Sequence, residues 1–243
     1  MTQAPRKPLK SAVARRFDRR APNYDQQSLW VQDPHVERHL LADLQEKSRI
    51  LEAAGGTGAI SLAATLQGHS VTCSDISPGM LRQARAKGLS VVKADMHHLP
   101  FPDAAFDVVL IRQGLQYANL QLALQEFKRV AAREIRTAQI VVGSDHQRHL
   151  WRKLFATLGQ HDRVVFLKGE IEAEAACLSL KALRAEYFRG VERLIAPNLA
   201  ARRLSMDHKR IAALIQEVDP DARPEGEDWL HAVEWEILQL RPE

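Results

Sequence analysis

Three short stretches of the sequence hold residues that could bind a nucleoside. The first is a glycine-rich bend at Gly55, Gly56 and Gly58, where missing side chains let a ligand approach the backbone. Asp75 and Asp95 each end a predicted apolar strand further along the chain. Asp75 follows the bend by about 20 residues, the spacing at which nucleoside-binding folds place a carboxylate on ribose hydroxyls. We expect the Asp95 carboxylate to accept a hydrogen bond from an adenine amino group.

Buried strands and helices must position these residues. An apolar run over 50–54 predicts a strand before the bend, and helical spacing resumes from Ala59 to Leu66. Because the carboxyl ends of parallel strands border a common crevice, we expect the bend and the two carboxylates to face one ligand. Taken alone, a glycine bend between a strand and a helix is a common structural feature.

The remaining elements follow from hydrophobic periodicity. The predicted strands are 69–75, 91–95, 106–111, 139–145 and 229–240, and the predicted helices are 11–20, 34–44, 120–130, 151–158, 170–183, 183–194 and 209–218. Ser77 and Pro78 are suited to cap another helix after the second strand. This pattern predicts an α/β fold with a doubly wound, Rossmann-like, mostly parallel sheet. Helices cover both faces, and a helical lid is inserted after the fifth strand.

Two motifs resemble those of a known enzyme family. Residues 51–58 read LEAAGGTG, close to the family's usual LDLGCGTG, and residues 95–107 match a longer acid-x-x-x-L-P-F-x-D-x-x-F-D pattern. On these residues the chain resembles the class I S-adenosylmethionine-dependent methyltransferases, in particular the ubiquinone and menaquinone C-methyltransferase branch. The resemblance covers roughly residues 13–145. It departs at Ala54, which replaces the usual first glycine and narrows the loop, and at 131–137, where relatives usually carry a Pro-Gly-Gly turn.

The resemblance implies a set of cofactor-binding residues. Tyr24 belongs to a segment, residues 17–25, that in the family lies over the cofactor near its methionine end. Glu52 would help to organise that end, although a carboxylate here also suits a structural hydrogen bond to the glycine loop. Ile76 would give the adenine an apolar face, and Gln116 stands where many relatives carry His. The full predicted set is Tyr24, Glu52, Ala54, Gly55, Gly56, Gly58, Asp75, Ile76, Met80, Asp95, Met96 and Arg112.

No motif identifies a catalytic base. The candidates are His146, Tyr117 and His149, none of which is spaced to form a recognisable triad. A sulfonium methyl group is already activated, so alignment of the nucleophile and exclusion of water are the main tasks left to the protein. His97 and His98 are expected to be surface loop residues, and no metal site is predicted, because no further ligands stand near them in the sequence.

Four regions are expected along the chain. They are an N-terminal arm with helices over the cofactor site (1–47), the cofactor-binding core (48–147), a mainly helical substrate lid (148–210), and a C-terminal helix with a closing strand (211–243). The formal charges of the arm residues 1–20 and of the lid are each +6, whereas 211–243 carry −7. The lid charge favours an acidic or carboxylate-bearing substrate, but solvated helix faces explain it equally well.

The composition is that of a water-soluble protein. Hydrophobic residues make up 45% of the 243 residues, enough for a large core, and the net charge is +4. Two cysteines, Cys73 and Cys177, are too few for a disulfide framework, which favours a reducing compartment. No apolar run of about 20 residues suggests a membrane span, and the basic N-terminus lacks the apolar segment of a signal peptide. We therefore expect a cytoplasmic protein; its oligomeric state is not predicted.

The predicted function is transfer of a methyl group from S-adenosylmethionine, leaving S-adenosylhomocysteine, to a small acidic or aromatic, quinone-like acceptor. One alternative is an RNA or protein methyltransferase recruited by the basic N-terminal arm. Nucleic acid is the less favoured partner, because no aromatic residues interleave with the arm's basic residues and no N/D-P-P-Y motif follows the fourth strand. A second alternative is a nucleotide-binding module or an NAD-dependent oxidoreductase. The bend reads Gly-Gly-Thr-Gly and not G-x-G-x-x-G, which favours S-adenosylmethionine over NAD.

Overall fold

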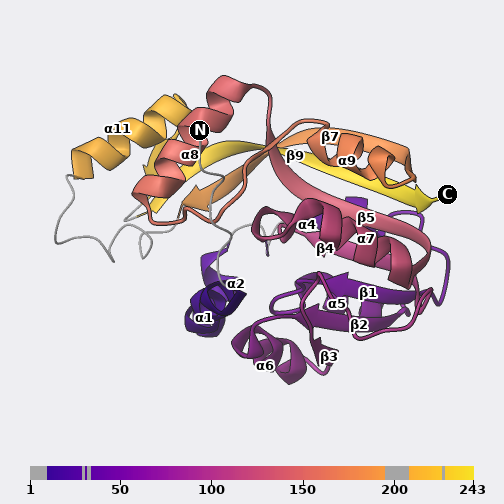
Figure 1. Ribbon diagram of the computed structural model, residues 1–243. Coiled ribbons are helices and arrows are strands. Elements are labelled where there is room, and N and C mark those ends of the chain that lie inside the picture. The colour runs from indigo at the N-terminus through magenta and orange to yellow at the C-terminus, as the bar shows by residue number, and fades with distance from the viewer. Residues whose placement is uncertain (1–9, 29–30, 32–33, 195–207, 226–227) are drawn as a thin grey trace.

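A nine-stranded sheet forms the centre of the part of the chain that the computed structural model describes, residues 10–28, 31, 34–194, 208–225 and 228–243 (Figure 1). The strands are β1 (Arg49–Ala53), β2 (Ser70–Asp75), β3 (Ser90–Lys93), β4 (Phe106–Arg112), β5 (Ala131–Val142), β6 (Phe166–Leu167), β7 (Leu180–Leu194), β8 (Arg223–Glu225) and β9 (Asp228–Pro242). Their order is β3-β2-β1-β4-β5-β9-β7, with β6 paired to β5 and β8 to β9.

The first five strands run parallel, and β9 is antiparallel to both β5 and β7. Strand order reverses between β1 and β4, so a crevice opens there at the carboxyl ends of the strands. The predicted doubly wound, mostly parallel α/β fold is confirmed.

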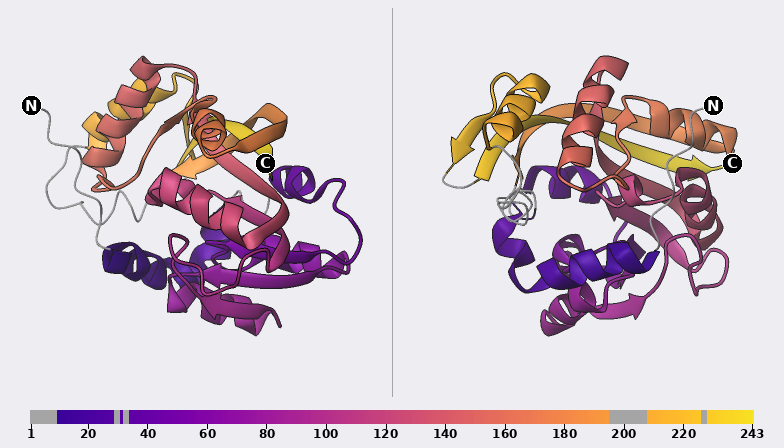
Figure 2. Two further views of the ribbon diagram at one scale, coloured as in Figure 1. Left: turned by 45° about the vertical axis from the view of Figure 1, so that its right-hand side comes forward. Right: turned by 60° about the vertical axis from the view of Figure 1, so that its left-hand side comes forward.

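Helices cover both faces of this sheet (Figures 1 and 2). They are α1 (Lys10–Arg20), α2 (Tyr24–Gln27), α4 (Pro34–Leu41), α5 (Ala59–Leu66), α6 (Pro78–Ala86), α7 (Leu120–Val130), α8 (Asp145–Thr157), α9 (Glu170–Cys177) and α11 (His208–Val218), with short 3-10 turns η1 (Ala21–Asn23) and η2 (Leu115–Tyr117). Leu51 of β1 packs in one cluster with Phe127 of α7 and Ile171 of α9. The next residue, Ile50, packs with Leu40 of α4 and Ile60 of α5 on the other face. Both strand faces are buried, which explains why β1 reads as a continuous apolar run.

The fifth strand begins earlier than predicted. A turn was expected over 131–137, but α7 passes directly into β5, because Ala131 has extended backbone angles (φ −89°, ψ 124°). Charged residues conceal the strand in the sequence. The Arg136 side chain is buried, yet it donates hydrogen bonds to Glu134 Oε1 (2.8 Å) and to the carbonyl oxygens of Leu40 (3.0 Å) and Ala42. A charge with these partners is tolerated inside a strand.

The helices predicted over 170–194 are wrong beyond Cys177. A turn with Ser179 at φ +54° follows α9, and residues 180–194 form β7, paired along its length with β9. The described part of 148–210 is therefore not mainly helical, because β6 and β7 join the sheet between helices. Pairing with a partner some 50 residues away in sequence outweighs local helical preference here.

Most other sequence expectations match the structure. The helices predicted over 11–20, 120–130 and 209–218 and the closing strand over 229–240 are confirmed as α1, α7, α11 and β9, and the helix predicted over 34–44 ends at Leu41. Residues 1–9, half of the basic arm, lie outside the described residues. None of the helices in the described residues combines the length and apolar character that crossing a bilayer requires.

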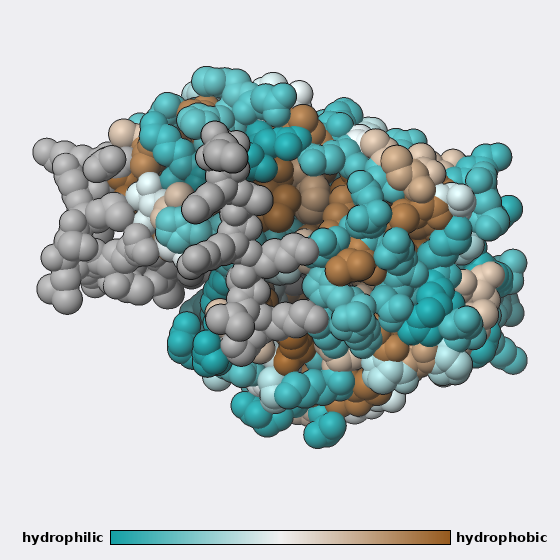
Figure 3. Space-filling model, in the orientation of Figure 1, coloured by the Kyte–Doolittle hydropathy of each residue, from teal (hydrophilic) through white to brown (hydrophobic). Residues whose placement is uncertain are grey.

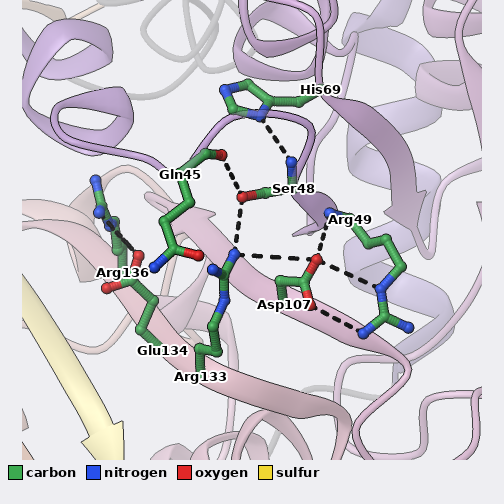
Figure 4. Close-up of polar contacts among 8 residues, drawn as sticks. All are labelled: Gln45, Ser48, Arg49, His69, Asp107, Arg133, Glu134 and Arg136. Carbon is green, nitrogen blue, oxygen red and sulfur yellow. Dashed lines mark hydrogen bonds and ion pairs between the residues drawn. The ribbon is translucent and has the colours of Figure 1, made fainter.

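A closed polar network holds the amino-terminal edge of the sheet (Figure 4). Asp107, at the start of β4, accepts hydrogen bonds from the Arg49 backbone N–H (2.8 Å) and from Arg49 Nη2 (2.9 Å). Ser48 Oγ accepts from Arg133 Nη2 (2.8 Å) and donates to the Gln45 carbonyl oxygen (2.6 Å), and the Ser48 N–H donates to His69 Nδ1 (3.2 Å). These groups are paired within the network, except that Arg133 Nε is buried without a partner in the described residues.

The outer surface offers little continuous apolar area. In the orientation of Figure 3 the described surface is largely hydrophilic, and hydrophobic residues form small, separated patches. The large hydrophobic side chains that are exposed in the described residues are Leu66 of α5, Leu122 of α7, Val164 of the loop before β6, and Leu183 and Val191 of β7. The crevice at the carboxyl ends of the parallel strands is therefore the candidate site for ligand binding and catalysis.

Candidate active site

A cavity of about 970 Å³ lies at the carboxyl ends of the parallel strands. Ten of the twelve predicted cofactor residues line it: Tyr24, Glu52, Ala54, Gly55, Gly56, Asp75, Ile76, Met80, Met96 and Arg112. The other two, Gly58 and Asp95, lie outside its lining. The structure thus brings the ends of β1, β2 and β4 to one cavity, with the loop after β3.

The glycines of the bend serve different purposes. A Cβ at Gly55 would lie 2.6 Å from Cys73 Sγ and 2.9 Å from Glu52 Oε2, so no side chain fits there. Gly56 has φ +58° and open space around it, which leaves its backbone accessible from the cavity. At Gly58, φ is +76° and a Cβ would meet Leu89 Cδ1 at 2.4 Å. Gly58 therefore permits close packing beneath the bend, away from the cavity.

Ala54 occupies a backbone conformation that favours glycine. Its φ is +51°, in the left-handed region that costs an L-residue roughly 1 kcal/mol. The methyl group fits because Gly114 faces it, where an added Cβ would lie 2.9 Å from Ala54 Cβ and 2.8 Å from Ile111 Cδ1. The missing side chain at Gly114 thus makes room for the extra methyl at Ala54.

Asp75 shapes the loops on both sides of it. Its Oδ2 accepts from the Gly56 N–H (2.9 Å) and its Oδ1 from the Ser77 N–H (2.8 Å). Burial raises the pKa of Asp75 to about 6. Ser77 caps α6 as predicted, accepting from the Met80 N–H (3.1 Å), and Ser77 Oγ donates to Asp18 of α1 (2.7 Å). A carboxylate that orders the glycine bend and the β2–α6 loop therefore faces the cavity.

Glu52 makes structural hydrogen bonds, the alternative to cofactor binding that the sequence left open, and it also lines the cavity. Its Oε2 accepts from the N–H (2.9 Å) and the hydroxyl (2.5 Å) of Ser61 in α5. Only 4% of Glu52 is exposed, and this burial raises the pKa of Glu52 to about 7. Arg112, itself 5% exposed, is near enough for its positive charge to oppose that rise. Glu52 is thus a buried acid whose charge the protein stabilises only in part.

The N-terminal segment closes the cavity on one side. The Tyr24 ring is buried, and the Phe17 ring meets it edge-on, as it does the Tyr117 ring, with centroids 6.3 and 5.4 Å apart. Asp25 accepts from the Thr57 hydroxyl (2.5 Å) and from Lys87 Nζ (2.6 Å), which fastens the segment to the glycine bend. The predicted position of residues 17–25 over the crevice matches this arrangement.

The expectation of a surface loop residue is confirmed for His98, which is exposed after β3, whereas His97 is only partly exposed; both also line the cavity. Asp95 Oδ1 accepts from the His97 N–H (3.0 Å) and lies 2.6 Å from His97 Nδ1, and His97 Nε2 accepts from the Asn119 N–H (2.9 Å). Because Nε2 accepts a hydrogen bond, the ring proton is on Nδ1, and the Nδ1–H donates a hydrogen bond to the Asp95 carboxylate. The Asp95 carboxylate, expected on adenine, thus orients a histidine that ties this loop to the start of α7. In the sequence, only the presence of a carboxylate acceptor and an imidazole donor two residues apart points to this contact.

The three candidate bases lie in different places. Tyr117 lines the cavity, whereas His146 and His149 are exposed on α8 outside the lining. The sequence places all three after strands β4 and β5, but a helix turns most of its side chains away from any one cavity.

The far side of the cavity comes from α8 and the loop that follows it. Its residues include Phe155, Gln160, Asp162, Arg163 and Val164, none of which the sequence assigned to a site. The Arg163 guanidinium lies 4.3 Å from the centroid of the Phe155 ring, and Arg16 of α1 forms an ion pair with Asp162. This pair joins the N-terminal segment to the α8–β6 loop. The apolar helical face at 151–158 was visible in the sequence, but nothing in it indicated a cavity.

Known proteins similar to this chain agree with the geometry. A family model described as a methyltransferase domain matches residues 51–134. A malonyl-acyl-carrier protein O-methyltransferase of Geobacter sulfurreducens is 33% identical over 198 residues, which are 74% of this chain and 71% of that protein. A demethylmenaquinone methyltransferase of Thermus thermophilus is 44% identical over 93 residues, 35% of this chain and 42% of that protein. The crystal structure of geranyl diphosphate C-methyltransferase from Streptomyces coelicolor, with bound S-adenosylhomocysteine, has a TM-score of 0.65 at 13% identity and covers 96% of this chain and 99% of its own.

Proposed function

The chain belongs to the class I S-adenosylmethionine-dependent methyltransferases, and from this premise we propose that it methylates a small molecule enclosed between the strand ends and the α8–β6 loop. The observation that carries this proposal is the closure above the cavity. Arg16 of α1 pairs with Asp162 of the cavity lining, the Arg16 guanidinium lies 5.4 Å from the centroid of the Tyr117 ring, and Phe17 packs between Tyr117 and Tyr24. A small acceptor or a flexible chain end fits such a space, whereas a folded RNA or protein surface does not.

The residues at the strand ends suit the methyl donor. Each Asp75 oxygen accepts one backbone N–H and keeps a further lone pair, so the two oxygens can take the two ribose hydroxyls. Gly56 leaves open space next to its backbone, and Ile76 and Met96 supply apolar lining for the adenine. We assign Glu52 to the methionine end. The raised pKa values of the two acids show that burial disfavours their charged forms, and hydrogen-bond donors of a ligand relieve that cost.

Methyl transfer places modest demands on the side chains. S-adenosylmethionine supplies a methyl group on a positively charged sulfur, which a nucleophile can displace directly. The protein's contribution is to align the acceptor and to exclude water. The aromatic cluster of Phe17, Tyr24 and Tyr117 contributes to both tasks. We propose no general base, because only Tyr117 of the three candidates lines the cavity.

Two classes of acceptor remain within the proposal. One relative acts on a malonyl thioester, whose free carboxylate needs no base to accept a methyl group, and another acts on a demethylmenaquinone. Arg152 and Arg163 line the acceptor side and favour a negatively charged group, while Phe155 and Val164 favour an aromatic one. A nicotinamide enzyme is not favoured, because the bend and the relatives both indicate methyl transfer.

Transfer of a radioactive methyl group tests the proposal. The protein would be incubated with methyl-labelled S-adenosylmethionine and a cell extract divided into small-molecule and macromolecular fractions, with malonyl-coenzyme A and 1,4-naphthohydroquinone as defined probes. We expect label in the small-molecule fraction, and none with an Asp75→Ala variant. Label that enters RNA or the polypeptide itself, and not an acyl group carried on it, while the small-molecule fraction stays unlabelled would contradict the proposal.

A further inference from the structure

A second, smaller cavity adjoins the first. Its volume is about 120 Å³, and it shares Tyr24, Gln113, Tyr117 and Phe155 with the larger cavity. Its other walls come from α1, η2, the end of β5, α8 and the loop that follows it, β7 and β9. We refer to it as the inner chamber. Since Tyr24 is a boundary of both spaces, the inner chamber lies next to the part of the site assigned to the methionine end.

Buried amide groups line the inner chamber without full pairing. Gln116 and Gln139 are only 4% and 2% exposed. Gln139 Nε2 donates to Gln113 Oε1 (3.1 Å), which leaves Gln139 Oε1 and Gln113 Nε2 buried with no partner in the described residues, and Gln116 Oε1 is in the same state. About nine in ten buried polar groups are paired in folded proteins. Three unpaired amide atoms around one chamber therefore indicate a hydrogen-bonding ligand.

The hydrogen-bonding character of the chamber does not depend on how the amides are oriented. The oxygen and nitrogen of a glutamine amide can be interchanged by a half-turn of the group. If Gln113 and Gln139 both turn, the bond between them is kept, and one free donor and one free acceptor still remain. A ligand in the chamber must therefore both donate and accept a hydrogen bond.

Charged groups of both signs line the chamber. His231 is neutral at pH 7, because burial lowers the pKa of His231 to about 4, and Glu192, 8% exposed, adds negative charge. The guanidinium groups of Arg16, Arg20 and Arg163 also line it; these side chains are partly buried, Arg16 Nη2 pairs with Asp162, and Arg16 Nη1 is buried without a partner in the described residues. A carboxylate beside the amides would have no proton to donate to the free acceptor.

We propose that the inner chamber is a subsite for an uncharged, protic group of the methyl acceptor, a hydroxyl or a carboxamide. The inference rests on the proposed function in that the group belongs to the molecule being methylated. An apolar cavity of about 150 Å³ holds benzene, so the chamber of about 120 Å³ takes the polar group and at most part of the ring that carries it. The chamber thereby selects one end of the acceptor and directs the remainder toward the larger cavity.

The substitution Gln116→Leu separates ligand binding from structural support. The Gln116 side chain makes no hydrogen bond in the described residues, so an apolar side chain of similar size should leave the melting temperature unchanged or raise it. Gln67→Leu is the matched control, because Gln67 is exposed at the end of α5 and lines neither cavity. Both variants are expected to bind S-adenosylhomocysteine as the wild type does in calorimetric titrations.

Phenol, benzamide and benzoate serve as probes of the chamber. Each would be titrated into the nitrogen-15-labelled, full-length protein saturated with S-adenosylhomocysteine, and the side-chain amide signals of Gln113 and Gln139 followed by NMR. We expect phenol or benzamide to shift these signals, benzoate to bind at least tenfold more weakly, and Gln116→Leu to weaken the binding of the protic probe at least tenfold. Comparison of phenol with benzamide then identifies the preferred group.

Three results would overturn the inference. They are preferential binding of benzoate, equal binding of the protic probe by wild type and Gln116→Leu, or no shift of the two amide signals with any probe. A lower melting temperature for Gln116→Leu with unchanged probe binding would assign the glutamine to structure alone. Failure of S-adenosylhomocysteine itself to bind the wild type would instead refute the proposed function, so the two failures are distinguishable.

Discussion

The two edges of the parallel sheet use similar residues in opposite ways. At the amino-terminal edge, Asp107 is paired with Arg49, and this contact holds the pKa of Asp107 below its usual range (Figure 4). At the carboxyl-terminal edge, burial raises the pKa of Asp75 and Glu52 to about 6 and about 7. One edge pairs its charges within the protein, and the other keeps carboxylates whose charged forms are poorly stabilised.

This difference indicates which edge stabilises the fold and which one binds. The network at the amino-terminal edge pairs its carboxylate and its serine groups within the protein, with Arg133 Nε the exception among the described residues, so its main contribution is to stability. Carboxylates and amides that remain under-paired inside a cavity cost stability until a ligand supplies the missing partners. Substitutions of equivalent residues at the two edges should therefore have separable effects on ligand affinity and on unfolding.

The largest effect is expected for Asp75→Ala. The loss of two accepted backbone hydrogen bonds frees the glycine bend and the β2–α6 loop, and it removes the carboxylate assigned to the ribose. Hydrogen bonds to a charged group contribute about 1.5–3 kcal/mol each, so the loss of two should lower the affinity for S-adenosylhomocysteine at least about 100-fold. Calorimetric titration measures this loss. Asp107→Ala, at the opposite edge, should bind as the wild type does, and equal losses in both variants would remove the distinction between the edges.

The second effect concerns pH. The folded-state pKa values of Glu52 and Asp75, about 7 and about 6, lie above those of the same groups in an unfolded chain, roughly 4. The folded protein therefore binds more protons between about pH 4 and pH 7, and these groups lower the free energy of unfolding as pH rises through that window.

Glu52→Gln removes one of these groups. The decrease in the free energy of unfolding between about pH 4 and pH 7 should become smaller by roughly 1–3 kcal/mol, as measured by denaturant titration at several pH values. Asp107 provides the opposite sign, because its lowered pKa stabilises the fold above about pH 4 and loses that effect below it. An unchanged pH dependence in Glu52→Gln would show that folding does not raise the pKa of Glu52.

A smaller effect is expected at the paired edge. Asp107→Asn weakens the contacts with the Arg49 backbone and side chain, and the Arg49 side chain is half exposed, so water compensates for much of the loss. The melting temperature should fall by a few degrees without any change in S-adenosylhomocysteine affinity. A drop in affinity would mean that the two edges are coupled through the sheet.

The smallest effect is expected for Ala54→Gly. Glycine relieves the positive φ of +51° but adds backbone freedom to the unfolded chain, so the two changes oppose each other. The net gain in stability should not exceed about 1 kcal/mol. The wider bend leaves cofactor affinity equal or higher. A clear loss of stability would show that the Ala54 methyl contributes packing against Gly114 that outweighs its strain.

Local sequence signals predicted the carboxyl-terminal edge well. Gly55 and Gly56 directly follow the first strand, and Asp75 ends the second with the cap at Ser77 just after it, so local patterns indicate a strand, a bend and a helix start. Ten of the twelve cofactor residues that the family resemblance implied line the cavity.

Contacts between distant segments could not be predicted in this way. Residues 183–194 read as a helix, because their pairing with β9 involves residues far away in sequence. His97 read as a surface residue because its partner Asn119 lies 22 residues further on. Arg136 read as part of a turn because its partners, Leu40 of α4 and Glu134 of β5, are not evident from the local sequence. Gln116 and Gln139 become neighbours only once η2 and β5 lie side by side around the inner chamber.

Calorimetric titration of the full-length protein with S-adenosylhomocysteine, and in parallel with NAD, tests the central claim most directly. The arrangement of the glycine bend, Asp75 and Glu52 predicts one molecule of S-adenosylhomocysteine bound per chain and no measurable heat with NAD. Tight binding of NAD by a protein that does not bind S-adenosylhomocysteine would contradict the account.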